Sequence, residues 1–317
     1  MKKLTINEAV QLLRQGDVVG IPTETVYGLA ADARSDVAVR KIFEAKGRPA
    51  DNPLIVHIGT VDQIDELVTD VSANARLLMA HFWPGALTLI LPSKGTVSAS
   101  VTAGLPTIGI RMPNHPVALA LLRDVQLPLA APSANLSGKP SPTSAAHVID
   151  DLANRIPGVV DGGYCNIGLE STVIDMTSDV PVILRPGGIS KAQIEAIIGS
   201  VSMADDTANR PKAPGMKYTH YAPDARVYLI QGDPTYFETR IADFQKKNLK
   251  IGVLCEAASA SKYPLANVVK TIGFEGQELY AALRAFDAEG MDIVLCEFFQ
   301  HEAVMNRLMK ASKETIL

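Results

Sequence analysis

The sequence predicts an α/β fold, a mixed and twisted sheet with packed helices, joined by a linker to a small Rossmann-like α/β domain. Short apolar runs typical of buried strands alternate with segments of helical periodicity along most of the 317 residues. Residues 1–201 hold more strand-like runs than a doubly wound unit needs, which indicates a mixed sheet. Residues 202–224 contain several prolines and few aliphatic side chains, so we expect a linker there and a separate domain at 225–317.

Helix caps and apolar periodicity define the elements of the N-terminal domain. The capping-box pair Thr5 and Glu8 predicts a helix near the start of the chain, and Gly47 is the residue type expected just past the end of a second one. The predicted helices are Ile6–Arg14, a segment capped by Ser35 or Asp36, Ala73–Phe82, Val117–Arg123 and a segment from Ser190 to about Ile198. The predicted strands are Val18–Ile21, Leu54–Ile58, Leu87–Leu91, Thr107–Arg111, Pro128–Ala131, Val159–Asp161, Thr172–Met176 and Val182–Leu184.

The C-terminal domain shows a cleaner α/β rhythm. Its first two predicted strands are Val227–Ile230 and Ile251–Leu254. The segments that follow them are Q-G-D-P-T and C-E-A-A-S. The G-x-G-x-x-G pattern that lets a pyrophosphate approach the backbone is absent, so we assign no dinucleotide to this domain. The other predicted elements are helices at Thr235–Phe244, Gln277–Ala288 and Ala303–Ala311 and a strand at Ile293–Leu295.

The composition narrows the class of protein. Hydrophobic residues make up 47% of the chain, and 30 Lys and Arg against 34 Asp and Glu give a net charge of −4, which disfavours a generally cationic surface for nucleic acid. We see no secretory signal pattern and no run of the roughly 18 apolar residues that span a membrane, so we expect a cytoplasmic protein. Cys165, Cys255 and Cys296 lie far apart and are expected to be buried thiols.

Four polar clusters in the N-terminal domain follow or end predicted strands, which is where open α/β sheets bind ligands. Each alone is also explained as a polar turn, solvated surface charge, a satisfied structural histidine or a flexible Ser/Pro loop. The clusters are Thr23, Thr25 and Tyr27 after one strand, K-G-R at 46–48 with Asn52 and His57, the run from Ala131 to Thr143 with Asn135, Gly138 and Lys139, and Ser171 and Thr172 with Arg185.

Two of these clusters suit anions. The small residues of the third let backbone amides approach a phosphate, and Arg185, followed by Pro and two glycines, can present its planar fork to phosphate or carboxylate. We find no Ser-His-Asp order, activated Cys, metal-ligand spacing or Walker motif. Such an inventory suits an enzyme that places a polyanion and a second reactant in line and stabilises charge through cations and magnesium, without a protein nucleophile.

A series of motifs runs through the N-terminal domain in order. They are P-T-E-T-V-Y-G-L at 22–29, K-G-R-P at 46–49, N-P-L at 52–54, W-P-G-A-L-T at 83–88, I-R-M-P at 110–113, A-P-S-A-N-L-S-G at 131–138 and S-T-V-I-D at 171–175. Together they resemble the YrdC-like threonylcarbamoyl-AMP synthases. A-P-G-M-K-Y-T-H-Y-A-P at 213–223, with the C-terminal α/β unit, is similar to the longer, two-domain branch of that family.

This resemblance implies a YrdC-like sheet and a nucleotidyltransferase. The implied reaction converts L-threonine, bicarbonate or CO2, and ATP carrying Mg²⁺ into L-threonylcarbamoyl-AMP and pyrophosphate, the first step toward threonylcarbamoyladenosine beside the anticodon of tRNA. A carbamate formed on the threonine amine attacks the α-phosphorus of ATP. The implied partners are these small-molecule substrates and the downstream tRNA threonylcarbamoyl transferase machinery, with at most weak direct contact to tRNA and none to a membrane.

The resemblance also implies roles for single residues. The Lys-x-Arg and Ser-x-Asn signatures of the family fall on Lys46, Arg48, Ser133 and Asn135, which are expected at the ATP phosphates and their magnesium. The expected L-threonine site consists of Arg111 for the carboxylate and of Thr25, His57, Ser171 and the backbone of Ala131 for the amine and hydroxyl. The other residues expected to bind ATP are Asn52, Thr107, Ser141, Arg185 and Tyr221.

The linker has two interpretations. Most Pro-rich interdomain segments are spacers. Alternatively, Met216–Tyr221 folds over the cleft as a lid, with Gly215 as its hinge and Tyr221 at ATP, because a carbamate must be shielded from water. Analogy with the family favours the lid.

Other functions remain open at this point. A noncatalytic double-stranded RNA or ribosome-binding module could use Lys46, Arg48, Arg111 and Arg185, although the acidic net charge opposes it. A carbamoyl transferase of the hydrogenase-maturation type also contains a YrdC-like domain, but it carries Cys-rich zinc motifs and an acylphosphatase unit that this chain lacks. An inactive two-domain scaffold is the remaining alternative.

Overall fold

The computed structural model describes residues 1–204 and 221–312, except for the side chain of Pro234. Most of the predicted linker, including Gly215 and Met216 of the predicted lid, lies outside the described residues. The chain divides into two compact units, each described by itself below. Of the described residues, the first unit comprises Met1–Ser137, Pro142–Asn166 and residues 170–204, and the second comprises Gly138–Ser141, Ile167–Leu169 and residues 221–312.

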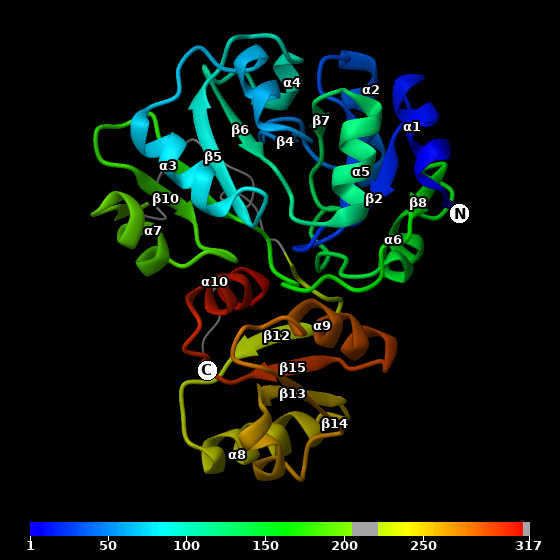
Figure 1. The fold of residues 1–317 in the computed structure, drawn as a ribbon. Helices are drawn as coiled ribbons and strands as arrows, with labels where there is room; N and C mark the ends of the chain where they lie inside the picture. The colour runs from blue at the N-terminus through cyan, green and yellow to red at the C-terminus, as the bar shows by residue number, and fades with distance from the viewer. Residues whose placement is uncertain (205–220, 313–317) are drawn as a thin grey trace. The chain divides into compact units, whose positions relative to one another are not determined.

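The first unit is built on a mixed sheet that has eleven strands in the part of the chain described (Figure 1). Parallel pairs such as β4 with β6 lie beside antiparallel pairs such as β5 with β6, so the predicted mixed sheet is confirmed. In spatial order the strands are β1 (Lys2–Leu4), β8 (Gly158–Val160), β2 (Val19–Ile21), β3 (Gly28–Asp32), β7 (Leu129–Ala130), β4 (Ile55–His57), β6 (Thr107–Arg111), β5 (Leu87–Pro92), β9 (Thr172–Asp175), β10 (Val182–Arg185) and β11 (Ser202–Met203).

Helices cover both faces of this sheet because successive strand residues point to opposite sides. In β3, Leu29 and Ala31 belong to one core and Ala30 belongs to the other. Helices α1 (Ile6–Arg14) and α5 (Pro116–Val125) pack in the core that holds Ala30. The core that holds Leu29 receives residues from α2 (Asp36–Lys46), α3 (Ala73–Phe82), α4 (Ala99–Thr102), α6 (Ala145–Leu152) and α7 (Lys191–Ile198).

Several predicted elements have the bounds that the structure shows, including strand Thr107–Arg111. The predicted bounds Ile6–Arg14 and Ala73–Phe82 agree with the structure, and Thr5 and Ser35 cap their helices through their side chains. Strand β3 was not predicted, because its Gly-Leu-Ala-Ala-Asp sequence has low strand propensity and pairing with β2 and β7 decides its conformation. The other elements missed were α4, α6, β1, β11, β14 and two 3₁₀ helices at Val61–Glu66 and Ala257–Lys262.

The second unit contains a parallel sheet with the strand order β12-β15-β13-β14 in its described residues. Parallel neighbours need crossover connections, and helices supply most of them, as the predicted Rossmann-like rhythm requires. The elements are β12 (Arg226–Leu229), α8 (Pro234–Gln245), β13 (Ile251–Glu256), β14 (Val268–Ile272), α9 (Leu279–Ala288), β15 (Ile293–Cys296) and α10 (Glu302–Ala311). Over residues 1–204 and 221–312, no helix combines the length and the apolar character needed to cross a lipid bilayer.

Helix α2 ends at a glycine in the left-handed conformation. Gly47 has φ 61° and ψ 36°, and the next amide, Arg48 N–H, donates to the carbonyl of Phe43 at 3.1 Å. Glycine adopts this conformation without the steric penalty that a Cβ atom brings. The turn therefore fixes the direction in which the chain leaves the helix, between Lys46 and Arg48.

The first testable prediction concerns this turn. Gly47→Ala should lower the free energy of unfolding by about 1–2 kcal/mol, the cost of a left-handed L-residue. No atom lies within 4 Å of the position of the added Cβ, so a clash does not confound the result. Gly47→Asn is the matched control, since Asn tolerates this conformation and should cost less. Urea unfolding in which the two variants lose equal stability would contradict the explanation.

Candidate active site

The predicted site residues of the first unit lie at strand ends and in the adjoining loops. His57 and Arg111 are the last residues of β4 and β6, and they face each other in the register of these parallel strands. The loop between β2 and β3 carries Thr25 and is tied to the loop after β7, because Ala134 N–H donates to Tyr27 O at 2.8 Å. The site is thus built on the central strands of the sheet.

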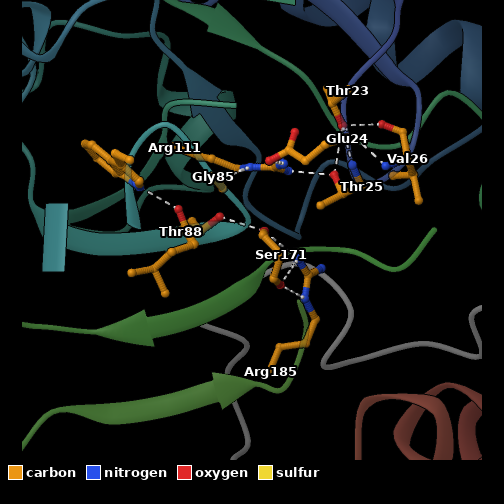
Figure 2. Close-up of polar contacts among 11 residues, drawn as sticks. Thr23, Glu24, Thr25, Val26, Gly85, Thr88, Arg111, Ser171 and Arg185 are labelled. Carbon is orange, nitrogen blue, oxygen red and sulfur yellow. Dashed lines mark hydrogen bonds and ion pairs between the residues drawn. The ribbon is translucent and has the colours of Figure 1, made fainter. Parts of the chain in front are cut away.

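Arg111 is buried and held from several sides (Figure 2). Its Nε–H donates to the carbonyl of Gly85 at 3.1 Å, and its Nη1–H donates to Thr25 Oγ1 at 2.8 Å. Its Nη2 lies 2.6 Å from Glu24 Oε1, a close ion pair that is not aligned as a hydrogen bond. Thr25 Oγ1 is in turn 2.8 Å from Thr23 Oγ1. Arg111 therefore joins three segments that are far apart in the sequence.

A second group of polar side chains connects three other strands (Figure 2). Arg185 Nη2–H donates to the carbonyl of Ser171 at 2.9 Å, and Arg185 Nε–H donates to the same oxygen at 3.2 Å. The Ser171 hydroxyl is 2.8 Å from the hydroxyl of Thr88, on β5. Arg185 is only 4% exposed. The structure thus brings the predicted residues Ser171 and Arg185 together.

The side chain of Lys46 is buried, so the alternative of a solvated surface charge is wrong for this residue. Its ammonium donates to the carbonyl of Ser133 at 2.5 Å and to that of Asn135 at 2.6 Å. Burial lowers the pKa of Lys46 well below its usual value, and the nearby Arg48 guanidinium acts in the same direction. The two predicted signatures, Lys-x-Arg and Ser-x-Asn, are thereby joined through the side chain of Lys46.

Asn52 lies in the same region and is 1% exposed. Arg48 Nη2–H donates weakly to its backbone carbonyl, at 3.4 Å. Neither Oδ1 nor Nδ2 of the Asn52 side chain has a hydrogen-bond partner among the described residues. A buried amide without partners costs free energy, so its side chain suits a ligand that supplies them.

His57 is buried beside Arg111. Burial and the Arg111 charge lower the pKa of His57 to about 3, so the ring is neutral near pH 7. Its Nδ1 has no hydrogen-bond partner in the part of the chain that the structure describes. A neutral imidazole can donate or accept one hydrogen bond toward a polar ligand.

The remaining predicted residues are Ala131, Thr107, Ser141 and Tyr221. Ala131 is tied to β4, because its N–H donates to Ile55 O at 3.0 Å. Thr107 begins β6 and Arg111 ends it, so about 13 Å of strand separates them and the structure does not bring Thr107 to the Arg111 end. Ser141 and Tyr221 belong to the second unit, and both are buried there. The Tyr221 ring centroid is 5.4 Å from that of Tyr280, in the same unit.

Sequence reasoning missed two residues of this site. Glu24 stood within the first motif but was given no role, although it is a buried partner of Arg111. Thr88 ended the W-P-G-A-L-T motif and was likewise given no role. A carboxylate among hydroxyls in P-T-E-T was the one available signal for Glu24. The three cysteines are free and buried, as expected.

Family models match both parts of the chain. A model described as Telomere recombination matches residues 11–187, and one described as Threonylcarbamoyl-AMP synthase, C-terminal domain, matches residues 189–313. A curated threonylcarbamoyl-AMP synthase of Bacillus subtilis is 51% identical and covers 97% of this chain and 92% of its own length. The chain belongs to the threonylcarbamoyl-AMP synthase family. The predicted family is thereby confirmed.

Other similar proteins agree with this assignment. The Pyrococcus abyssi threonylcarbamoyl-AMP synthase is 44% identical over 98% of this chain and 95% of its own. The crystal structure of P. abyssi Sua5 complexed with L-threonine has a TM-score of 0.93 at 44% identity, with 98% of this chain and 95% of that chain covered. Escherichia coli YciO is 28% identical with a TM-score of 0.54, covering 60% of this chain and 92% of its own. The predicted fold class is confirmed as well.

The second testable prediction concerns His57. Its pKa in the folded state, about 3, lies below the ordinary value of 6.5. Between these two pH values the unfolded chain therefore binds a proton on His57 that the folded protein does not bind. Stability should therefore fall as the pH is lowered through about 6.5, with a slope of up to about 1.4 kcal/mol per pH unit for this proton.

Substituting His57→Gln should remove this contribution, so that the free energy of unfolding depends less steeply on pH between about 7 and 5. Urea titrations at several pH values measure the slope. His81→Gln, which removes an exposed histidine of α3, is the control. Equal slopes in the His57 variant and the unmodified protein would refute the assignment of a neutral, buried His57.

Proposed function

We propose that the protein is a nucleotidyltransferase that forms L-threonylcarbamoyl-AMP and pyrophosphate from L-threonine, bicarbonate or CO2, and ATP, for threonylcarbamoyladenosine in tRNA. The observation that carries this proposal is the match with curated threonylcarbamoyl-AMP synthases over nearly the whole chain. The relative solved with L-threonine bound supports the amino-acid substrate. With this role we expect a cytoplasmic protein that passes its product to tRNA threonylcarbamoyl transferase machinery.

In this proposal the Arg111 end of β6 is the L-threonine site. The Arg111 guanidinium binds the carboxylate, because it is buried and retains N–H donors beyond those that hold it in place. Thr25, Ser171 and the backbone of Ala131 take the amine and hydroxyl, together with neutral His57. A site that hydrogen-bonds a hydroxyl discriminates strongly against amino acids that lack it.

The proposed ATP site uses the two joined signatures. Lys46 holds the loop that carries Ser133 and Asn135, while Arg48 and Asn52 offer N–H donors for phosphate oxygens. We also assign Arg185, Thr107, Ser141 and Tyr221 to ATP. Mg²⁺ bound to ATP would neutralise part of the phosphate charge. This donor set of cations and amides fits phosphates, and among the described residues no group of three His, Cys, Asp or Glu is arranged to hold a metal ion by itself.

The chemistry that these residues perform is placement and charge stabilisation. A carbamate oxygen of N-carboxythreonine attacks the α-phosphorus while pyrophosphate leaves, so negative charge gathers on the phosphates. Arg48 and Lys46 stabilise that charge, and Arg111 fixes the other reactant. Buried groups are effective here because water does not screen them.

The burial of these cations weakens the RNA-binding alternative. Lys46 is 2% exposed, and Arg111 and Arg185 are 4% exposed. The phosphates of a nucleic acid are bound by Lys and Arg side chains that are exposed at the protein surface. The site therefore suits a small ligand that enters it better than a duplex that lies on it.

The third testable prediction is the substrate dependence of the reaction. The protein, mixed with ATP, Mg²⁺, bicarbonate and each amino acid in turn, should release pyrophosphate with L-threonine. Valine, which replaces the hydroxyl with a methyl group, should support turnover about 10⁴-fold less well. Turnover that ignores threonine would defeat the proposed function.

The fourth prediction tests the phosphate site. Arg48→Ala should lower the turnover number by about 10²- to 10³-fold, as expected when one donor to developing charge is lost. Arg40→Ala is the matched control, because Arg40 is an exposed arginine on α2, the helix that precedes Arg48. Thermal unfolding of both variants checks the fold. Near-normal turnover by a folded Arg48 variant would contradict the assignment.

A further inference from the structure

Glu24 is a buried carboxylate whose oxygens are not satisfied by the protein. Its side chain is 6% exposed, and neither Oε1 nor Oε2 accepts a hydrogen bond from any described residue. Its close contact is the ion pair with Arg111 Nη2, and that nitrogen also lacks an aligned acceptor in the described part of the chain. A carboxylate offers about four acceptor positions, and leaving them empty in a buried place is costly. The ion pair between Glu24 and Arg111 therefore lacks hydrogen-bond partners on both sides within the described residues.

Orienting Arg111 does not require Glu24. The guanidinium is already held by the Gly85 carbonyl through Nε and by Thr25 Oγ1 through Nη1. Both of these contacts have the geometry of hydrogen bonds, whereas the contact with Glu24 does not. A buried ion pair kept only for stability is usually completed by further hydrogen bonds. The arrangement points instead to a ligand that supplies what both groups lack.

A zwitterionic α-amino acid supplies both. Its ammonium carries three N–H donors and its carboxylate carries acceptors, and the two groups are attached to one carbon atom. Their protein partners must then be neighbours of opposite charge, as Glu24 and Arg111 are. In the absence of the amino acid the two protein charges neutralise each other, and binding exchanges their ion pair for two pairs with the ligand.

We propose that Glu24 binds the ammonium group of L-threonine and accepts the first proton that this group must lose before the carbamate forms. This role rests on the function proposed above. It makes Glu24 a catalytic residue, while Arg111 keeps the carboxylate in place.

The proton balance is simple. The Glu24 carboxylate takes one proton from the –NH3⁺ group, leaving –NH2 and a neutral carboxylic acid. The nitrogen lone pair then forms the C–N bond to carbon dioxide, whose π electrons move to oxygen. A second proton leaves the nitrogen for water, which gives the carbamate. Glu24 returns its proton to solvent before the next turnover.

The charge of Glu24 acts on the pKa values of two other titratable groups, His115 and Cys165. Burial lowers the pKa of His115, at the start of α5, and raises the pKa of the Cys165 thiol to about 12. His57 faces Arg111 from β4 and is also neutral near pH 7. Arg111 is thus the charged neighbour of Glu24 in this group at neutral pH. Among the groups around Glu24, the threonine amine is therefore the one that changes its charge between about pH 7.5 and 9.5, and effects on more distant groups such as Lys46 are common to the unmodified protein and the variant.

The test compares two ligands on the full-length protein without ATP. Calorimetric titration should show that Glu24→Gln raises the Kd of L-threonine by about 10- to 100-fold, the loss of one charge-assisted hydrogen bond. The Kd of 3-hydroxybutanoate, which has the carboxylate and hydroxyl but no amine, should not increase. Glu66→Gln removes an exposed carboxylate in the same unit and should change neither Kd.

The pH dependence of turnover gives a second readout. The ratio of the turnover numbers of the unmodified protein and Glu24→Gln should shrink as the pH rises from 7.5 to 9.5, because more threonine then carries a free amine. A purely structural role would leave this ratio constant. If Glu24→Gln does not fold, Glu24→Asp repeats the ligand comparison with the charge kept and moved by one methylene, and threonine should again lose more affinity than 3-hydroxybutanoate.

Two results would overturn the role of Glu24: an unchanged Kd for L-threonine, or equal weakening of both ligands. Threonine-dependent pyrophosphate release by the unmodified protein would then leave the proposed function intact. Release that does not depend on threonine would defeat the proposed function itself, so the two failures are distinguishable.

Discussion

The guanidinium of Arg111 is the interaction on which the candidate site depends. It ends a central strand and binds the Gly85 carbonyl, the Thr25 hydroxyl and the Glu24 carboxylate, so it fixes the loops that precede β3 and β5. A buried cation must be paired and hydrogen-bonded, because the interior of a protein does not solvate charge. The two loops supply these partners to Arg111, and the buried charge therefore positions them. The P-T-E-T segment is held in its conformation in this way.

Lys46 repeats this principle at the end of α2. Its ammonium is bound to the carbonyls of Ser133 and Asn135, so a helix end and the loop after β7 are held together by a buried cation. Such groups need little reorganisation when negative charge develops beside them. In the proposed function, buried cations and hydroxyls of this kind allow an adenylation without a nucleophile supplied by the protein.

Local signals in the sequence predicted the parts of the fold that local interactions decide. Helices α1 and α3 have the predicted bounds, and Gly47 has the left-handed conformation that its position suggested. Strand β3 and helix α6 were missed, because neighbouring strands and core packing decide their conformation. Strand propensity carries little information where the pairing is long-range.

The family, the fold class, the helix caps and the inventory of cations and hydroxyls could be predicted from the sequence alone. How these groups are paired depends on the folded chain. The tertiary structure placed Glu24 against Arg111, Lys46 against two backbone carbonyls and His57 in a site that keeps it neutral. These pairings join residues more than eighty positions apart, and burial sets their charge states. Neither property is encoded in the neighbouring residues, because both arise when the sheet assembles and excludes water.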